Sequence, residues 1–374
     1  MYRGQELQIL VPIDVAQLLT AQARRIEDER ILVAEAKKCA LENERKARHK
    51  RDQEQERAVP AQPGPGEIEI VSVEQLAILD ENVEAMESIT QKAAMPIYRC
   101  LTGSRGRFRS VPKIDPRLIA ELVSEFENMA EPIAYLSREL ELMAHLPPEE
   151  FQITPILLLG SPGIGKTAFA GRLAEVLGLP YSKVNGGEAS FSLTGSHPSY
   201  TKAMPGNILK QIAMNNSACP VILVDEIDKP SGERYPLSNA LLDLLEPINA
   251  INFKDEFFQF SFNASKAIWI LTANSATGVS EPLLSRVAAF DIPTPDEAQR
   301  KRLIETSITK LCCRTGHRTG LDPGDVTTLA RRLDLDLRML TRLVRNAFID
   351  ALRDKSDQVR LTLPRAARTG IGFY

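Results

Sequence analysis

A glycine-rich loop near the middle of the chain has the residue types that bind phosphate groups. Residues 160–167, GSPGIGKT, fit the pattern GxxxxGK[ST] and lie between an apolar run, PILLL, and a helical pattern, TAFAGRLAEVLG. The glycines permit backbone turns that aim successive N–H groups at a phosphate, and the following helix N-terminus adds its dipole. We expect Lys166 to reach the β- and γ-phosphates and Thr167 to ligate Mg²⁺. The predicted nucleotide-binding residues are Gly160, Ser161, Pro162, Gly163, Ile164, Gly165, Lys166, Thr167 and Ala168.

Two carboxylates follow an apolar run downstream of this loop. Asp225 and Glu226 end the stretch PVILVDE, which has the length and continuous apolarity of a strand buried on both faces. Acids at the end of such a strand are costly to desolvate unless a cation or a reacting water lies nearby. Asp225 can hold Mg²⁺ through water, and Glu226 is placed to polarise the water that attacks the γ-phosphate. A strand that simply ends at the surface is the alternative, which the phosphate loop upstream disfavours.

Two further polar residues follow a third apolar run. AIWILTAN ends in Asn274, which could hydrogen-bond the γ-phosphate or the attacking water, although an Asn that ends a strand is also common turn chemistry. Arg286 follows shortly afterwards and carries a delocalised charge suited to a transferring phosphoryl group. An isolated Arg is more often an ordinary surface residue.

A parallel sheet is required to bring these residues together. Over residues 151–294, apolar runs alternate with helical patterns, which predicts an α/β nucleotide-binding domain with a parallel sheet. Residues 295–355 show only helical periodicity and predict two or three helices. Residues 67–150 predict a mainly helical neck region. Within it the apolar spacing of residues 116–145 indicates one amphipathic helix, bent at Pro132.

The two ends of the chain differ from this middle part. Residues 1–58 predict a helical arm with a short apolar stripe that is compatible with coiled-coil pairing. Its charged second half is either a solvated helix face or an arm that binds a partner. Residues 59–66, VPAQPGPG, indicate a stiff linker, and residues 356–374 form a short, mildly basic tail.

Charge and composition exclude several classes of protein. Lys and Arg total 46 against 49 for Asp and Glu, a net charge of −3, so a nucleic-acid binder that relies on bulk positive charge is disfavoured. Basic residues do gather in one loop-like segment, CLTGSRGRFRSVPKIDP, where we favour a solvated loop over a nucleic-acid site. These residues are Arg105, Arg107, Arg109 and Lys113.

The cysteines and the hydropathy of the chain indicate the cellular compartment in which we expect the protein. The five cysteines form no CxxC pair and the four histidines lie far apart, which argues against a zinc cluster. Nowhere do 18 apolar residues run together, so we expect no membrane span. Glu6 and Asp14 interrupt the apolar N-terminal stretch and argue against a signal peptide. We therefore expect a reduced, cytoplasmic protein.

The order of these motifs resembles that of an AAA+ ATPase. Within that group, TPILLLGSPGIGKT, TGSHPSYTKAMPGNILKQIA, VILVDEIDKPSG, NALLDLLEPINAINFKDEFFQFSF and ANSATGVSEPLLSRV resemble the ATPase module of Lon proteases, over residues 155–347. The resemblance implies an α/β fold of the AAA+ P-loop αβα type, in which an all-helical lid follows the parallel sheet. It also implies ATP and Mg²⁺ as cofactors.

The resemblance implies roles for particular residues. Asn274 matches sensor 1, and Arg338, in LDLRMLTRLVRNA, resembles the sensor 2 arginine, although that helix holds several other arginines. Arg286 matches the arginine finger, which completes the active site of a neighbouring subunit. A finger that acts on a neighbour implies a homo-oligomer, most simply a hexameric ring.

The resemblance also marks a candidate pore loop. Tyr200, in SYTKAMPG, matches the aromatic position that grips an extended polypeptide, and Thr201 follows it. Thr201 and Lys202 stand where the family has an aliphatic residue and a glycine, which predicts a weaker grip or one tuned to acidic segments. Phe257 and Phe258 lie in a second candidate loop, but we expect at least one of them to pack in the core.

Three functions fit these features. Lon proteases continue past the lid into a peptidase domain with a Ser–Lys dyad, whereas only about two dozen residues follow the last predicted helix here, so we expect no peptide cleavage by this chain. The favoured function is an ATP-driven protein remodeller, with the N-terminal arm and the pore loop engaging a protein. The first alternative is a nucleotide-switched scaffold. The second is a nucleic-acid-associated machine, which the net charge disfavours.

Overall fold

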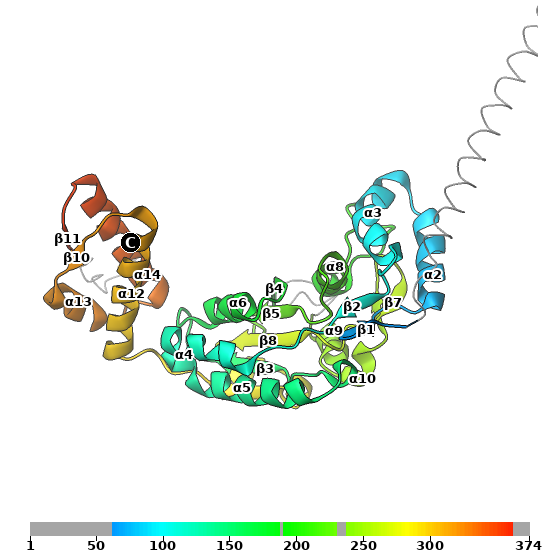
Figure 1. Ribbon diagram of the computed structural model, residues 1–374, viewed down its shortest axis with the longest axis horizontal. Helices are drawn as coiled ribbons and strands as arrows, with labels where there is room; N and C mark the ends of the chain where they lie inside the picture. Colours follow the sequence, from blue (N-terminus) through cyan, green and yellow to red (C-terminus); the bar gives the residue numbers. More distant parts are fainter. Residues whose placement is uncertain (1–61, 188–189, 230–236, 362–374) are drawn as a thin grey trace, which may run out of the picture. The chain divides into compact units, whose positions relative to one another are not determined.

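The computed structural model describes residues 62–187, 190–229 and 237–361 (Figure 1). The predicted arm at 1–58 lies outside these ranges, as do the first residues of the linker and most of the tail.

A parallel sheet of five strands forms the centre of the molecule. Every neighbouring pair in it is parallel. The strands in spatial order are β4 (Tyr181–Asn185), β5 (Val221–Asp225), β8 (Ile268–Ala273), β3 (Ile156–Leu159) and β9 (Ala288–Asp291). All residues of β3, β5 and β8 are buried, which confirms the three apolar runs as central strands covered on both faces.

Helices and a hairpin surround this sheet. Helix α6 contacts β4, β5 and β8 directly, and Figure 1 draws α6 and α5 on opposite sides of the strands. The elements of this part are α6 (Lys166–Leu177), α7 (Phe191–Thr194), α8 (Asn207–Met214), α9 (Leu237–Leu244), α10 (Pro247–Ala250), β6 (Phe253–Asp255), β7 (Phe260–Phe262), η4 (Ala276–Gly278) and α11 (Glu281–Leu284). The architecture is the predicted α/β fold of the AAA+ type.

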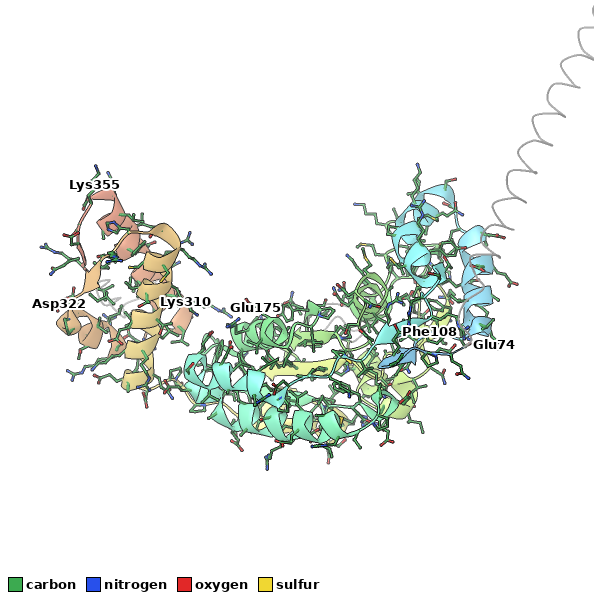
Figure 2. All side chains as sticks on the ribbon, viewed as in Figure 1. Glu74, Phe108, Glu175, Lys310, Asp322 and Lys355 are labelled. Carbon is green, nitrogen blue, oxygen red and sulfur yellow. The ribbon has the colours of Figure 1, made fainter. Side chains whose placement is uncertain are left out.

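The neck region shares one hydrophobic core with the sheet, since a single cluster of buried side chains runs from Ile68 to Ile292. The neck contains α2 (Val73–Glu84) and α3 (Ser88–Thr102). It also contains the antiparallel pair β1 (Glu67–Glu69) and β2 (Phe108–Ser110). Phe108, labelled on β2 in Figure 2, has a fully buried side chain. The segment expected to be a solvated loop therefore includes a strand.

The basic residues of that segment are also placed differently from the prediction. Arg109 is 5% exposed, and its guanidinium donates hydrogen bonds to backbone carbonyls, including Ile212 O at 2.8 Å and Ala213 O at 2.8 Å. Arg105 and Arg107 form ion pairs with the carboxylates of Glu67 and Glu69, respectively. The pairing of β1 with β2 sets these carboxylates beside Arg105 and Arg107. The prediction of a solvated loop was wrong for Arg109, because its side chain is buried and bonded to backbone carbonyls.

The predicted helix over residues 116–145 is broken, and not at Pro132. The chain forms η1 (Pro116–Ile119), α4 (Ala120–Glu125), η2 (Glu127–Met129), α5 (Ala130–His145) and then η3 (Pro148–Glu150). The break lies at Phe126, whose φ of −132° and ψ of 61° are not helical. Pro132 lies in the first turn of α5, where a missing N–H breaks no helical hydrogen bond.

Residues 295–361 form a helical lid with its own hydrophobic core, which runs from Ile304 to Leu361. Its helices are α12 (Glu297–Thr315), α13 (Pro323–Ala330) and α14 (Leu337–Arg353). Asp296 and Gln299 form a capping box at the start of α12, and Asp336 caps α14. A short parallel pair joins β10 (Gly320–Leu321) to β11 (Gln358–Val359). The first of these strands lies in the stretch expected to hold helices only, and the second lies in the predicted tail.

None of the helices in the described ranges is long and apolar enough to cross a membrane.

Candidate active site

The loop between β3 and α6 has the backbone geometry that a phosphate requires. Gly160 has a φ of 147° and Gly163 a φ of 76°, both in the region that favours glycine. A Cβ at Gly160 would lie 2.6 Å from the carbonyl oxygen of Ile292, and one at Gly163 would lie 2.6 Å from Cβ of Asp336. Helix α6 begins at Lys166, immediately after the loop. The first N–H groups of α6 therefore lie next to the loop, an arrangement that fits an anionic group.

Lys166 is the cation of this loop. Its side chain is mostly buried, and its ammonium donates to the carbonyl oxygens of Gly160 and, at 3.1 Å, Ser161. Burial lowers the pKa of Lys166 below its usual value, and the nearby charges of Asp225, Asp228 and Glu226 oppose that effect. A desolvated ammonium held at the phosphate loop fits the charge of a nucleotide.

Asp225 receives hydrogen bonds on both carboxylate oxygens. Thr167 donates to Oδ2 at 3.0 Å, Thr272 donates to Oδ1 at 2.5 Å, and the Lys183 ammonium lies 2.6 Å from Oδ2. Burial raises the pKa of Asp225, but the hydrogen bonds from Lys183, Thr272 and Thr167 outweigh it, so the pKa is below its usual value. An ionised carboxylate beside a threonine hydroxyl suits Mg²⁺, a cation that prefers oxygen ligands.

Glu226 has a strained backbone. Its φ is 60°, in the left-handed region that non-glycine residues seldom adopt. The Glu226 N–H donates to the Thr272 hydroxyl at 3.0 Å, and its Oε2 lies 2.5 Å from the Lys229 ammonium. Thr272 therefore links the two acids, because its hydroxyl accepts from Glu226 and donates to Asp225.

The phosphate loop, Asp225 and Glu226 line one cavity of about 610 Å³. Its volume lies within the range of ordinary ligand sites. It is lined by Lys166, Thr167, Asp225, Glu226, Asn274 and Arg338, with other residues of the loop and of the lid helices α12 and α14. The Asn274 N–H donates to Oδ2 of Asp228 at 2.9 Å, which fixes the end of β8 against the segment after β5. The cavity thus brings together most of the sequence-predicted site residues. Those that do not line it are Gly160 and Ser161 at the start of the loop, Arg286, and the pore-loop residues Tyr200 and Thr201.

Arg286 is the exception among the predicted catalytic residues. The described residues that line the cavity do not include it. Its Nη1 donates to Pro282 O at 2.8 Å, and its Nε lies 3.5 Å from Oε2 of Glu246. A guanidinium held away from the cavity of its own chain is compatible with action on a neighbouring chain.

The lid and the segment before α5 close the other side of the cavity. The Leu337 N–H, at the start of α14, donates to Gly163 O at 3.0 Å. The Asn128 side chain donates to Ile164 O at 3.1 Å and Pro293 O at 3.2 Å. The backbone of the phosphate loop therefore contacts both the lid and Asn128.

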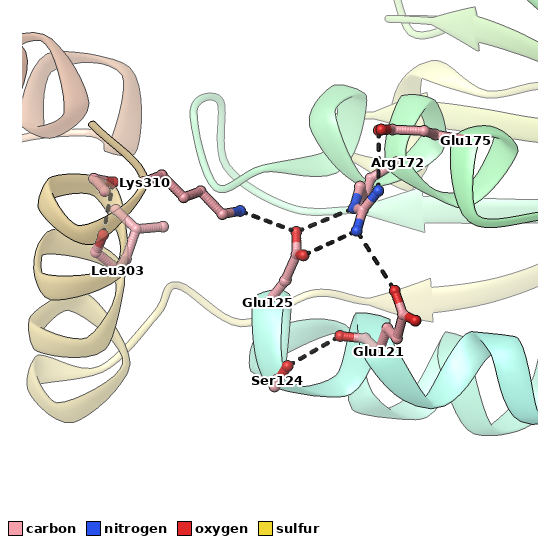
Figure 3. A network of polar contacts seen from close by, with 8 residues as sticks. Glu121, Ser124, Glu125, Arg172, Glu175, Leu303 and Lys310 are labelled. Carbon is pink, nitrogen blue, oxygen red and sulfur yellow. Dashed lines mark hydrogen bonds and ion pairs between the residues drawn. The ribbon is translucent and has the colours of Figure 1, made fainter. Parts of the chain in front are cut away.

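A polar network runs beside this junction (Figure 3). The Oε1 of Glu125 lies 3.3 Å from the Nη2 of Arg172 on α6, and its Oε2 lies 3.6 Å from the ammonium of Lys310 on α12. Arg172 also pairs with Glu175 at 3.1 Å and with Glu121 at 3.6 Å. The side chains of Arg172 and Glu125 are 28% and 24% exposed, and ion pairs in contact with solvent contribute little stability each.

Some residues of the site were missed in the sequence. Lys183 and Thr272 are polar residues within strands β4 and β8, and that polarity in a strand was the available signal. Phe126 lines the cavity and packs edge-on against Phe169 with ring centroids 5.6 Å apart. Nothing in the local pattern distinguished Phe126 from the core residues of a helix.

Comparison with known proteins agrees with this geometry. Residues 156–293 match the family described as "ATPase family associated with various cellular activities (AAA)". The chain is also 37% identical over 159 residues to a Lon protease of Metamycoplasma arthritidis, across 41% of this chain and 19% of that protein. Residues 156–293 are an AAA module of the Lon type. The longest of these matches, to Lon protease 2 of Thermus thermophilus, has 32% identity over 238 residues and covers 62% of this chain and 28% of that protein.

Two solved structures share the fold of about three quarters of this chain. A closed-state reconstruction of Hsp104 with ATPγS and casein has a TM-score of 0.54 and 14% identity, over 76% of this chain and 60% of that one. An extended Saccharomyces cerevisiae Hsp104–casein complex has a TM-score of 0.53 and 16% identity, over 72% of this chain and 53% of that one. This chain matches only part of each Lon protease: 19% of the length of the Metamycoplasma arthritidis protein and 28% of that of the Thermus thermophilus protein.

The two candidate pore loops of the AAA module differ in exposure. Tyr200 is 51% exposed, and Thr201 is exposed beside it. Lys202 has a φ of 65°, in the left-handed region that favours glycine. Phe257 and Phe258 are both fully buried, so the expectation of core packing is confirmed for both and a second gripping loop is excluded at these positions.

Proposed function

We propose that this chain hydrolyses ATP and uses the cycle to remodel a protein substrate, acting as a homo-oligomeric ring, most simply a hexamer. The observation that carries the proposal is the single cavity in which Lys166, Asp225 and Glu226 meet. A phosphate-binding ammonium, a metal-holding carboxylate and a water-polarising carboxylate are the groups that phosphoryl transfer to water needs.

The residues around the cavity divide the chemistry. The loop N–H groups and Lys166 would bind the phosphates, while Thr167 and Asp225 would hold Mg²⁺. When bound, Mg²⁺ supplies positive charge that neutralises the phosphate oxygens. Glu226 would polarise the attacking water, and Asn274 would orient it. Water polarisation by Glu226 is compatible with its strained backbone, because strain of this kind accumulates at functional sites.

Two arginines would complete the site, one from the lid of the same chain and one from a neighbouring subunit. Arg338, on the lid helix α14, lines the same cavity and would report the γ-phosphate to the lid. Arg286 would reach the nucleotide of a neighbouring subunit, where its delocalised charge stabilises the transferring phosphoryl group. This division supports an oligomer, because Arg286 does not line the cavity of its own chain.

Protein substrate would be engaged by Tyr200 and Thr201 and selected by residues 1–58. The exposure of the Tyr200 ring supports this role, since an aromatic ring can wedge between side chains of any sequence. Both Hsp104 structures that share the fold contain casein, which supports a protein as the partner.

Two variants test the chemistry. We expect Lys166→Ala to abolish ATP binding, because the cation of the loop is lost. We expect Glu226→Gln to bind ATP and to turn over at least about 100-fold more slowly, since general-base catalysis is lost. Fluorescent ATP binding and phosphate release measure the two effects separately. Undiminished phosphate release by Glu226→Gln would exclude its role, and intact remodelling by Tyr200→Ala would exclude pulling by that residue.

A nucleotide-switched scaffold is the second candidate. The ion pair between Glu226 and Lys229 favours it, because that pair holds the carboxylate that would polarise water. Turnover that stays near background whichever protein partner is added would support the scaffold over the remodeller.

A nucleic-acid-associated machine has less support than the sequence indicated. Arg109 is buried, and Arg105 and Arg107 are paired with carboxylates, which leaves little of the basic segment to contact phosphates.

A further inference from the structure

Lys183 reaches the Mg²⁺-holding carboxylate from a neighbouring strand. It lies on β4, at the edge of the five-stranded sheet, and its ammonium is 2.6 Å from Oδ2 of Asp225. In the parallel pair of β4 and β5, Asn185 stands opposite Asp225 and Lys183 stands opposite Leu223. Lys183 therefore shares a sheet face with Asp225 and points along β4 toward it.

Asp225 has two neutral hydrogen-bond partners, Thr167 and Thr272, and one charged partner, Lys183. Thr272 donates to Oδ1, and Thr167 lies 3.2 Å from Oδ1 and 3.0 Å from Oδ2. Among the described residues, Lys183 is the one cation within ion-pair distance of this carboxylate. Lys166 instead donates to carbonyl oxygens of its own loop.

We propose that Lys183 competes with Mg²⁺ for Asp225 and so sets the Mg²⁺ concentration at which nucleotide binds tightly. The inference rests on the proposed function, because it takes Asp225 as the residue that holds the metal. No role in catalysis is assigned to Lys183, which acts through Asp225 as a regulating residue.

The two cations exclude each other for an electrostatic reason. An ammonium and a divalent cation a few ångströms apart repel strongly, and one carboxylate cannot compensate both. The Lys183 side chain is 40% exposed, whereas that of Asp225 is 8% exposed. Lysine is a hydrated point charge on a flexible stem, so it can swing from an edge strand into water at little cost. The exchange keeps Asp225 compensated throughout, which avoids the cost of an unpaired buried charge.

The test measures the Mg²⁺ dependence of nucleotide binding by the full chain. Fluorescent mant-ADP at a fixed concentration is titrated with MgCl₂, and the Mg²⁺ midpoint is recorded. Loss of one positive charge beside the metal should lower the midpoint in Lys183→Met by about tenfold. Lys183→Arg keeps the charge and should stay within about twofold of the parent chain. Lys210→Met removes an exposed lysine of α8 and serves as the control for net charge.

Binding in EDTA separates this inference from the proposed function. If the parent chain binds mant-ADP neither in EDTA nor in Mg²⁺, nucleotide binding itself is wrong. If it binds, and the Mg²⁺ midpoint of Lys183→Met is unchanged or raised while its binding in EDTA is intact, competition by Lys183 is wrong.

A measurement on the unmodified protein covers the case in which Lys183→Met fails to fold. The chain with ADP is treated with an amine-acetylating reagent, with and without Mg²⁺, and each lysine is quantified by mass spectrometry. Acetylation of Lys183 should rise severalfold when Mg²⁺ is added, because the ammonium is released to solvent, while Lys210 should stay constant. Equal or reduced acetylation of Lys183 would overturn the proposal.

Discussion

At the scale of single residues, the hydroxyl of Thr272 connects the two acids of the site. It is fully buried, it donates to Asp225 and it accepts from the N–H of Glu226. Thr272→Val keeps the shape and removes the hydroxyl, leaving the part-buried N–H of Glu226 and the Oδ1 of Asp225 without this partner. We expect the free energy of unfolding to fall by about 1–3 kcal/mol, measured by urea denaturation without nucleotide.

Thr272→Ser is the matched control, because it restores the hydroxyl. It should recover most of the stability and of the turnover, since the bond that holds the Glu226 backbone at its φ of 60° is kept. Equal stability of the Val and Ser variants would show that the hydroxyl does not stabilise this turn.

The residues of the site were predictable to different degrees. Lys166, Asp225 and Glu226 belong to contiguous patterns whose spacing along the chain already encodes their geometry. Lys183 and Thr272 act across strands, and their contacts with Asp225 depend on sheet order and register, which one sequence does not display.

At the scale of elements, the turn that joins β6 to β7 depends on the buried carboxylate of Asp255. Its Oδ1 accepts from the N–H groups of Phe257 at 3.0 Å and Phe258 at 2.8 Å, and its Oδ2 accepts from the N–H of Gly206 at 3.1 Å. Gly206 ends the loop that carries Tyr200, so Asp255 ties the candidate pore loop to the turn between β6 and β7.

This carboxylate makes stability depend on pH. Burial raises the pKa of Asp255 from 3.8 to about 7, against the hydrogen bonds from Phe258, Gly206 and Phe257. Between these values the folded chain retains a proton that the unfolded chain has released. Stability should therefore fall as pH rises from about 4 to about 7, by up to about 1.4 kcal/mol per pH unit from this group.

Asp255→Asn isolates that contribution, because an amide does not titrate. When urea midpoints are compared at several pH values, the midpoint of the parent should fall relative to that of the variant as the pH rises from about 4 to about 7, and the difference should be constant above that. Curves that remain parallel from pH 5 to pH 8 would contradict a titrating Asp255.

Arg109 joins the neck region to α8. Its guanidinium binds the carbonyls of Ile212 and Ala213 in the last turn of α8, which lack helical partners there. Arg109→Met should lower the free energy of unfolding by about 2–4 kcal/mol, because several buried carbonyls lose a charged donor. Arg105→Met, at a more exposed ion pair, should cost below about 1 kcal/mol. Equal losses for the two variants would argue against a structural role for Arg109.

Elements were predictable where one periodicity held over the whole element. The three central strands are continuously apolar, and their length and composition sufficed. The helical spacing of residues 116–145 continues across the break at Phe126, where the chain turns so that Asn128 can bond to Ile164 O and Pro293 O. Tertiary contacts therefore determine this break, which local periodicity does not show. In the same way, β2 is a strand because it pairs with β1.

At the scale of the whole molecule, the proposed ring requires each site to borrow an arginine. Arg286 is held by Glu246 and by the carbonyl of Pro282, and it does not line the cavity of its own chain. Arg286→Ala should therefore bind ATP with unchanged affinity and lose turnover by about 1,000-fold or more, as arginine fingers do elsewhere.

Mixing two inactive variants tests whether Arg286 acts between subunits. Arg286→Ala keeps an intact cavity, and Glu226→Gln keeps an intact finger, so a mixed oligomer contains junctions in which both parts are functional. Phosphate release should recover on mixing, reach a maximum near equal amounts and depend on total protein concentration, because assembly brings the two chains together. Each variant mixed with Lys166→Ala provides the control: Arg286→Ala should recover, since Lys166→Ala supplies a finger, whereas Glu226→Gln should not, since neither partner has an intact cavity. No recovery in either Arg286→Ala mixture, in oligomers shown by sedimentation to contain both chains, would mean that Arg286 does not complete a neighbouring site.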